Sequence, residues 1–246
     1  MAEDFRRADR PDVSQSGAVA PSTFVLLHGA GGSAAYWYLV SPRLEQAGHR
    51  VIAVDLPNWP GATLTDQADA IVAAIADADR VVLVAQSMAG FAAPLCCDRL
   101  PVDWLVLVNA MVPRPGETAG EWWANTGQDE AARANDLREG RDPDAAFDPM
   151  TTFLHDVPPD ILDEVLAAES SEPVDSLFTE PLALDRWPEV ATTVLVGRED
   201  RLFPYEFQVR VARERLGVAA EPLPGGHLLA LSQPAALAER LLAGPR

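Results

Sequence analysis

The sequence predicts an α/β protein with a doubly wound, mostly parallel sheet and an inserted helical cap. Short runs of Val, Leu and Ile recur along the chain and are apolar at every position. Such runs are typical of strands that are buried on both faces of a parallel sheet. Helical patterns separate the runs, as crossover helices would. The alternation stops between residues 111 and 187, where helical stretches rich in proline and acids contain no strong strand pattern.

The 246 residues suit one α/β domain with an insertion. Residues 1–21 are polar and rich in Arg, Asp and Ser, and we expect a loose tail there. We expect a core of residues 22–110 and 188–246, with residues 111–187 as the cap, because so long a segment is not a bare loop. The expected strands are 23–27, 50–56, 80–85, 104–108, 192–197 and 219–223, and the expected helices are 34–47, 65–78, 88–100, 205–216 and 234–242.

The composition argues against several classes of protein. The net charge of -18, from 19 basic and 37 acidic residues, would repel nucleic acid and anionic membranes. The N-terminus lacks the apolar run of a signal peptide, and no apolar stretch is long enough to span a bilayer. We therefore expect a cytoplasmic protein that binds neither nucleic acid nor membrane. Neither Cys nor His spacing indicates a metal, and we expect no cofactor; the sequence does not indicate an oligomeric state.

A serine lies at a predicted sharp turn from a strand to a helix. Ser87 follows the strand 80–85 and precedes the helix 88–100, so its hydroxyl would be exposed above the end of the sheet. The residues two before and two after it, Ala85 and Ala89, are small, as a tight turn requires, although the usual pattern has Gly at both positions. We interpret Ser87 as a nucleophile; the alternative is a helix N-cap serine.

A serine nucleophile needs a base to take its proton and a carboxylate to orient that base. Asp200 follows the strand 192–197, at the strand end where open α/β sheets place functional groups. The spacing Gly-x-x-Asp-x-x-x-Pro favours it over Glu199. Of the four histidines only His227 follows Asp200, and the two glycines before it predict a flexible loop that presents the imidazole. The order serine, acid, histidine predicts Asp200 as the acid and His227 as the base.

A glycine-rich turn over residues 28–33 follows the first strand, and glycine allows close approach of the backbone to a substrate. Acyl transfer builds negative charge on the carbonyl oxygen, which two backbone N–H groups can stabilise. We expect these donors to be the amides of Ala30 and Met88, the latter being the residue after the nucleophile. A phosphate-binding loop is disfavoured because the turn lacks Gly-x-Gly-x-x-Gly and Gly-Lys-Ser/Thr. We expect His28 to brace the turn.

These motifs together resemble the α/β-hydrolase superfamily over the whole chain except the tail and the cap. They are HGAGG at 28–32, AQSMAG at 85–90, Gly-x-x-Asp-x-x-x-Pro at 197–204 and GGH at 225–227. The absence of a hairpin before the first strand is similar to the small-core branch that includes plant methyl esterases and hydroxynitrile lyases. The loop 55–61 also fits, although NWPG replaces the frequent Gly-x-Gly there.

The resemblance implies a serine hydrolase that cleaves a small carboxylic ester or lactone through an acyl-enzyme. The related lyases carry Thr after the first-strand His and Lys after the catalytic His, whereas this sequence has Gly29 and Leu228, which favours hydrolysis. Ser87 argues against the relatives that use an Asp nucleophile. The alternatives are a carbon–carbon bond hydrolase or hydroxynitrile-lyase-like enzyme on the same triad and, in another class, a non-catalytic small-molecule binding protein.

The predicted cap is strongly acidic, with 5 Arg against 18 Asp or Glu over residues 111–187. A substrate that enters beneath it would meet a negative field, which disfavours anions. We therefore expect a neutral and partly apolar small-molecule substrate. The candidate pocket residues follow the first strand, lie in the loop 55–61 or belong to the cap, where packing of the cap onto the core is the alternative role: Gly29, Trp59, Trp122, Trp123, Phe153 and His155.

Overall fold

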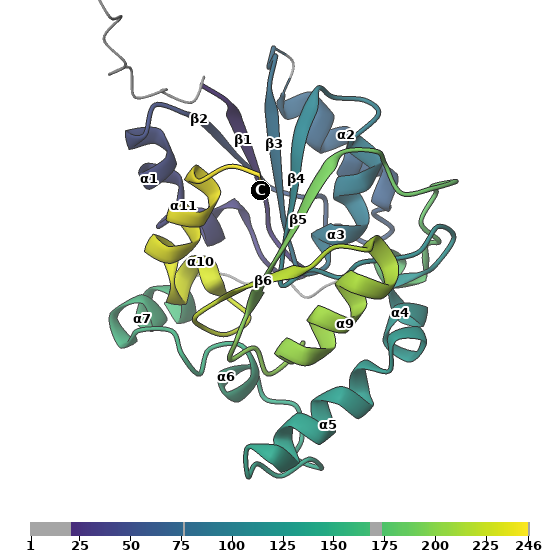
Figure 1. Cartoon of the computed structure of the whole chain (residues 1–246), viewed down its shortest axis with the longest axis vertical. Helices are drawn as coiled ribbons and strands as arrows, with labels where there is room; N and C mark the ends of the chain where they lie inside the picture. Colours follow the sequence, from purple (N-terminus) through teal and green to yellow (C-terminus); the bar gives the residue numbers. More distant parts are fainter. Residues whose placement is uncertain (1–20, 76, 168–173, 246) are drawn as a thin grey trace, which may run out of the picture.

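A computed structural model describes residues 21–75, 77–167 and 174–245 and confirms the predicted α/β class (Figure 1). Six parallel strands form one sheet in the order β2-β1-β3-β4-β5-β6. The first twenty residues of the expected tail lie outside the described residues. The strands are β1 (Thr23–Leu27), β2 (Arg50–Val54), β3 (Val81–Gln86), β4 (Val102–Val108), β5 (Ala191–Gly197) and β6 (Ala220–Leu223).

The strand order places the loops after β1 and β3 next to each other. The chain moves from β1 to one neighbour, β2, and then returns to the other side of β1 to form β3. Leu27, the last residue of β1, pairs with Ala85 near the end of β3. In open α/β sheets such a reversal of strand order opens a crevice at the carboxyl ends of the strands, where ligands bind. The loop 28–33 and Ser87 both lie at this reversal.

The sheet is buried between two layers of helices, which accounts for its continuous apolar strands. On one face α1 (Ser41–Gln46), α10 (Leu229–Ser232) and α11 (Pro234–Leu242) cover alternate residues of β1, β3 and β4. On the other face, the covering helices are α2 (Leu64–Ala74), α3 (Ala89–Ala92) and α9 (Tyr205–Leu216). Figure 1 shows these two layers on opposite sides of the sheet. The expectation of a doubly wound sheet is therefore confirmed.

Two of the expected helices are each divided into shorter pieces next to a proline. Residues 34–47 form a short 3-10 helix, η1 (Ala34–Trp37), and α1, whose first turn contains Pro42. Residues 88–100 form α3 and then η2 (Ala93–Cys96), whose first turn contains Pro94. Proline has no N–H for a helical hydrogen bond and fits only in a first turn. The single helices expected over these two ranges are therefore wrong.

Between β4 and β5 the described residues form short helices and no strand. Figure 1 shows α5, α6 and α7 beyond the carboxyl ends of the strands. The two ends of this segment are joined, since Gly116 N–H donates to Leu182 O at 2.9 Å and Leu182 N–H donates to Glu117 O at 3.0 Å. The limits of a cap at residues 111 and 187 stay a prediction. The helices are α4 (Ala119–Thr126), α5 (Gln128–Arg138), α6 (Pro149–Thr152), α7 (Pro159–Ala167) and α8 (Asp175–Thr179).

No helix within the described ranges is long and apolar enough to cross a bilayer.

Candidate active site

Ser87 occupies a strained turn directly after β3. Its φ of 53° is in the left-handed region, which a non-glycine residue enters only when its surroundings hold it there. Ser87 N–H donates to Val108 O at 3.2 Å, and Ser87 O accepts from Met111 N–H at 3.0 Å. A Cβ at Gly90 would overlap the carbonyl oxygen of Met111, so this position requires glycine. Strand β4 and the residues after it thus hold the turn from the side.

His227 connects Ser87 to Asp200. Its Nε2 lies 3.1 Å from Ser87 Oγ, and its Nδ1 lies 2.8 Å from Asp200 Oδ2. The His227 side chain is 3% exposed and that of Asp200 is 0% exposed. An ionised carboxylate only accepts hydrogen bonds, so Nδ1 carries the proton and Nε2 presents its lone pair to the serine hydroxyl. The structure thus brings together Ser87, His227 and Asp200, with the histidine between the serine and the acid.

Glu199, the rival acid, does not contact the imidazole nitrogens. Its carboxylate accepts a hydrogen bond from Gly225 N–H in the loop that carries His227. Asp200 is held by other donors as well: Leu202 N–H and Phe203 N–H each lie 2.9 Å from Oδ1. Neighbouring acids after β5 therefore have separate roles. Asp200 faces the histidine ring, whereas Glu199 fixes the backbone before the histidine.

Two buried amide side chains that the sequence analysis did not single out hold the acid and the base. Asn109, directly after β4 and with a φ of 44°, donates through Nδ2 to Gly226 O at 2.9 Å and to His227 O at 3.0 Å. Its Oδ1 accepts from Gly197 N–H at 2.7 Å. The signal in the sequence is a polar residue at the end of a continuous apolar strand, which Asn109 is.

Gln208 of α9 supports the same network. Its Nε2 lies 2.6 Å from Phe203 O, 3.2 Å from Asp200 Oδ2 and 3.3 Å from Asn109 Oδ1. All three are acceptors, so the NH₂ group of Gln208 must face them and its oxygen must point away. Asp200 therefore receives hydrogen bonds at both oxygens from four donors, which fix the position of its side chain. A lone glutamine in an amphipathic helix gives no sequence signal for this contact.

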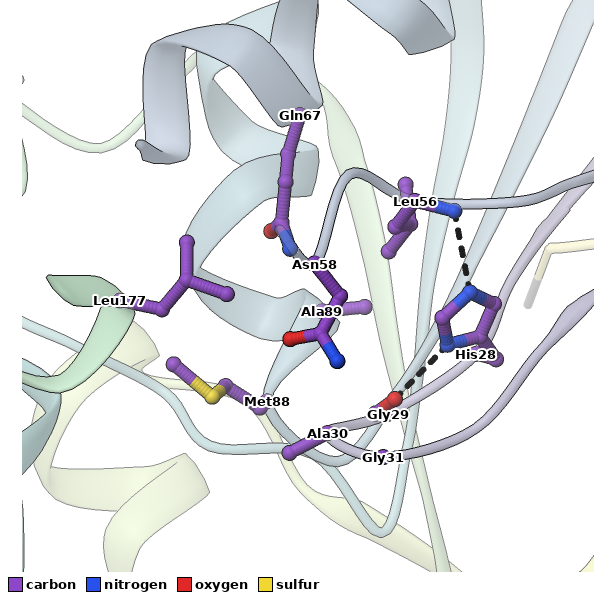
Figure 2. A pocket seen from close by; sticks show the side chains of 10 residues that line it. All are labelled: His28, Gly29, Ala30, Gly31, Leu56, Asn58, Gln67, Met88, Ala89 and Leu177. Atoms are coloured by element: carbon purple, nitrogen blue, oxygen red, sulfur yellow. Dashed lines mark hydrogen bonds between the residues drawn. The ribbon is translucent and has the colours of Figure 1, made fainter. Parts of the chain in front are cut away.

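His28 braces the loop after β1, as expected. Leu56 N–H donates to its Nε2 at 3.0 Å, so the neutral ring carries its proton on Nδ1, which donates to Gly29 O at 2.7 Å (Figure 2). Burial lowers the pKa of His28 below its ordinary value, partly offset by the Gly29 hydrogen bond and by Asp55. Because protonation would place a second N–H against the Leu56 amide, the neutral ring suits this loop.

Ala30 and Met88 line one small cavity beside Ser87 (Figure 2). Within the described residues neither backbone amide donates a hydrogen bond to protein, and their role as oxyanion donors stays a prediction. Gly29 lines the same cavity, and a Cβ there would come within 2.7 Å of Ser87 Cβ. The cavity is about 10 Å³, which holds at most one water molecule. Its other walls are formed by His28, Gly31, Leu56, Asn58, Gln67, Ala89 and Leu177.

The remaining candidate pocket residues lie in different surroundings. The rings of Phe153 and His227 are 5.3 Å apart, so Phe153 covers the imidazole. Trp123 contacts the ring of Phe203, which also touches His227. Trp122 is buried in the core, where its Nε1 donates to Val112 O at 3.1 Å. Trp59 is 56% exposed and does not line the cavity.

His155 lies beside the loop that carries His227. A Cβ at Gly226 would lie 2.8 Å from its Nε2. Burial lowers the pKa of His155 below its ordinary value, against the opposing charge of Asp156. The structure thus brings Phe153 and His155 to the loop that carries the base, and Ala30, Met88 and Gly29 to one cavity.

Comparison with known proteins shows which proteins this chain is similar to. Residues 24–240 match the Alpha/beta hydrolase family. The chain is 30% identical to methylesterase 7 of Arabidopsis thaliana, over 75% of this chain and 81% of that protein. It is 27% identical to norfluorocurarine synthase 1 of a Strychnos species, over 89% of this chain and 93% of that protein.

The fold is also that of a solved structure, polyneuridine aldehyde esterase. The TM-score is 0.71 at 22% sequence identity, and the match covers 91% of this chain and 99% of that one. Esterases and methylesterases are thus among the proteins similar to this chain. With the family match over most of its length, the chain belongs to the alpha/beta hydrolase family.

Proposed function

We propose that this chain is a serine hydrolase that cleaves a small carboxylic ester or lactone through an acyl-enzyme. The observation that carries the proposal is the pair of hydrogen bonds that joins Ser87 Oγ, His227 and Asp200. The fold alone would not decide the matter, because one fold hosts many functions. The esterases among the similar proteins favour the same reaction class.

In the first half-reaction Ser87 Oγ attacks the ester carbonyl carbon while His227 Nε2 takes the hydroxyl proton. The carbonyl oxygen becomes an anion and accepts hydrogen bonds from the amides of Ala30 and Met88. Asp200 stabilises the imidazolium and keeps its ring in place. When the tetrahedral intermediate collapses, the bond to the alcohol oxygen breaks and the imidazolium protonates that oxygen. The alcohol leaves and an acyl-serine remains.

In the second half-reaction water attacks the acyl carbon, and His227 Nε2 takes a proton from the water. The same two amides hold the new oxyanion. Collapse breaks the bond to Ser87 Oγ, which regains its proton from His227, and the carboxylic acid leaves. The protein's own groups provide every proton transfer in this sequence.

The proposed mechanism implies where each part of the substrate would lie. In this mechanism the leaving group lies toward His227, on whose ring Phe153 packs, because the imidazolium must reach the leaving oxygen. The acyl group lies toward the cavity of Ala30 and Met88, where Leu177 is an apolar wall. At about 10 Å³ this cavity admits an acyl group only when lining side chains move. We expect a neutral, partly apolar substrate, because the segment 111–187 carries 18 acidic residues against 5 Arg.

The test is covalent labelling with a fluorophosphonate together with hydrolysis of p-nitrophenyl acetate. The wild-type protein should be labelled at Ser87 and should hydrolyse the ester, and Ser87→Ala should lose both properties while it keeps its thermal unfolding midpoint. Retained hydrolysis by Ser87→Ala would show that another group is the nucleophile. A folded wild-type protein without labelling or turnover would instead favour a binding protein. A neutral ester should have a higher kcat/KM than its carboxylate-bearing analogue, and the difference should shrink with added salt.

A further inference from the structure

Residues 149–157, which comprise α6 and the turn after it, contact both loops that carry the acid and the base. Arg201, next to Asp200, donates from Nη1 to Thr151 O at 2.8 Å. His155 packs against Gly226, directly before the base. Phe153 packs on the imidazole of His227. Residues 149–157, which lie between β4 and β5, thus contact the loops of the acid and the base directly.

The most direct of these contacts is made by Asp156. Its Oδ2 accepts a hydrogen bond from Gly226 N–H at 2.6 Å. Its other oxygen, Oδ1, and His155 Nε2 each lie 2.8 Å from where a Cβ of Gly226 would be. Neither atom has a hydrogen-bond partner among the described residues, and the side chains are 19% and 10% exposed. Both atoms therefore face the Cα of Gly226, whose C–H groups form at most weak contacts.

Gly226 directly precedes His227, so whatever holds its backbone also sets the position of the imidazole. On the core side, Asn109 fixes the two carbonyls of Gly226 and His227. On the opposite side, the N–H of Gly226 is fixed by Asp156 alone among the described residues. A hydrogen bond to an ionised acceptor is stronger than one between neutral groups. Loss of the bond from Gly226 N–H to Asp156 would leave the loop that carries His227 held at this point only by Asn109.

We propose that Asp156 is a positioning residue for His227, which acts through the Gly226 N–H and thereby makes the inserted segment part of the catalytic arrangement. This inference rests on the proposed function, in which His227 must stay within hydrogen-bond reach of Ser87. Asp156 touches neither the serine nor the imidazole nitrogens. Its effect is on the alignment of the base, and so on the chemical steps rather than on binding of the substrate.

The experiment compares three substitutions of Asp156 in the full chain, with p-nitrophenyl acetate as substrate. Asp156→Ala removes the acceptor and should lower kcat by about 10- to 100-fold with little change in KM, as a misplaced catalytic group does. Asp156→Asn keeps an acceptor oxygen without the charge and should retain most of kcat. Asp156→Glu keeps the charge but moves the acceptor by one methylene, and it should be slow. The low-field NMR resonance of His227 Nδ1–H should shift or broaden in the Ala and Glu variants only.

The matched control is Asp160→Ala in α7. Asp160 is an exposed aspartate that also lies between β4 and β5, and its side chain forms no hydrogen bond or ion pair among the described residues. Its loss should leave kcat unchanged. The role of Asp156 is overturned if Asp156→Asn is as slow as Asp156→Ala, if Asp156→Glu matches the wild type, or if Asp160→Ala is equally slow. Because the Asn and Glu variants retain a polar side chain of similar size, they decide the matter even if the Ala variant does not fold.

Failure of this inference is distinguishable from failure of the proposed function. A wild-type protein that hydrolyses no ester and is not labelled at Ser87 overturns the proposed function. An active and labelled wild-type protein whose rate does not depend on the acceptor at position 156 overturns only the role of Asp156.

Discussion

Asp200→Asn changes the hydrogen bonding of the acid while it keeps the shape of the side chain. The carboxylate accepts at Oδ1 from two backbone amides, those of Leu202 and Phe203, and at Oδ2 from His227 Nδ1 and Gln208 Nε2. Asparagine has only one acceptor oxygen, and its NH₂ group is a donor. Wherever the NH₂ group lies, it therefore meets two donors that the native carboxylate satisfies.

The structure decides which orientation the asparagine takes. The two backbone donors at 2.9 Å are fixed by the loop, whereas the imidazole and Gln208 are side chains that can respond. We expect the oxygen to face the backbone and the NH₂ group to face His227. Nδ1 must then accept, which moves the imidazole proton to Nε2 and removes the lone pair that takes the proton of Ser87. A comparable change in another triad lowers the rate about 10⁴-fold, or roughly 5 kcal/mol of barrier.

The assay is kcat/KM for p-nitrophenyl acetate hydrolysis, with thermal unfolding measured in parallel. Glu199→Gln is the matched control, because glutamine keeps an oxygen that can accept from Gly225 N–H. It should be close to the wild type, and Asp200→Asn should be about 10⁴-fold slower and still folded. The reverse ranking, with a mild Asp200→Asn and a crippling Glu199→Gln, would refute the assignment of the acid.

Two further predictions concern the oxyanion loop and a buried ion pair. Gly29→Ala should lower kcat about 10²-fold, because a Cβ would push the loop of Ala30 away from Ser87; retention of wild-type turnover in a folded variant would contradict this role. Glu117→Gln should cost about 3–5 kcal/mol of unfolding free energy at neutral pH, because it leaves the buried Arg215 without its anion. Burial raises the pKa of Glu117, but hydrogen bonds from Arg215, Arg114 N–H and Asn125 outweigh this and hold it below 4.5. A carboxyl group whose pKa is lower in the folded than in the unfolded chain stabilises the fold at pH values above its pKa in the unfolded chain. Urea unfolding should therefore show that the difference in unfolding free energy between variant and wild type shrinks as the pH falls below 4.5. A difference in unfolding free energy that is equal at neutral pH and below pH 4.5 would contradict this account.

The sequence predicts the sheet well because the strands carry their own signal. Continuous apolar runs are required wherever helices cover both faces, and each of the six expected runs overlaps an observed strand. The helix boundaries are less well predicted. Pro42 and Pro94 interrupt otherwise helical patterns, and hydrophobic periodicity alone does not register the missing N–H group.

The three side chains proposed to react are also recoverable from order and spacing, but the groups that hold them are not. Asn109, Gln208 and Asp156 lie on three separate stretches of the chain and meet the acid and base loops only in the folded chain. A hydrogen bond between residues far apart in sequence leaves no periodic pattern. Trp122 shows the converse limit, because an aromatic residue in an inserted helix reads equally as pocket wall or core, and the structure places it in the core.

The glycines before His227 serve close approach between chain segments rather than the flexibility that the sequence suggests. Side chains bond the backbone of Gly225 and Gly226 on several sides, and Gly197 packs against their carbonyl oxygens, where a Cβ would lie 2.5 Å from each. A loop fixed in this way places the imidazole without leaving it mobile. It also couples positions that are distant in sequence: a larger residue at 226 would displace Asp156, and loss of the acceptor at 156 would leave the Gly226 N–H unpaired. Alteration of residues 149–157 to change which substrates fit should therefore preserve an acceptor at position 156, because the Gly226 N–H has no other partner among the described residues.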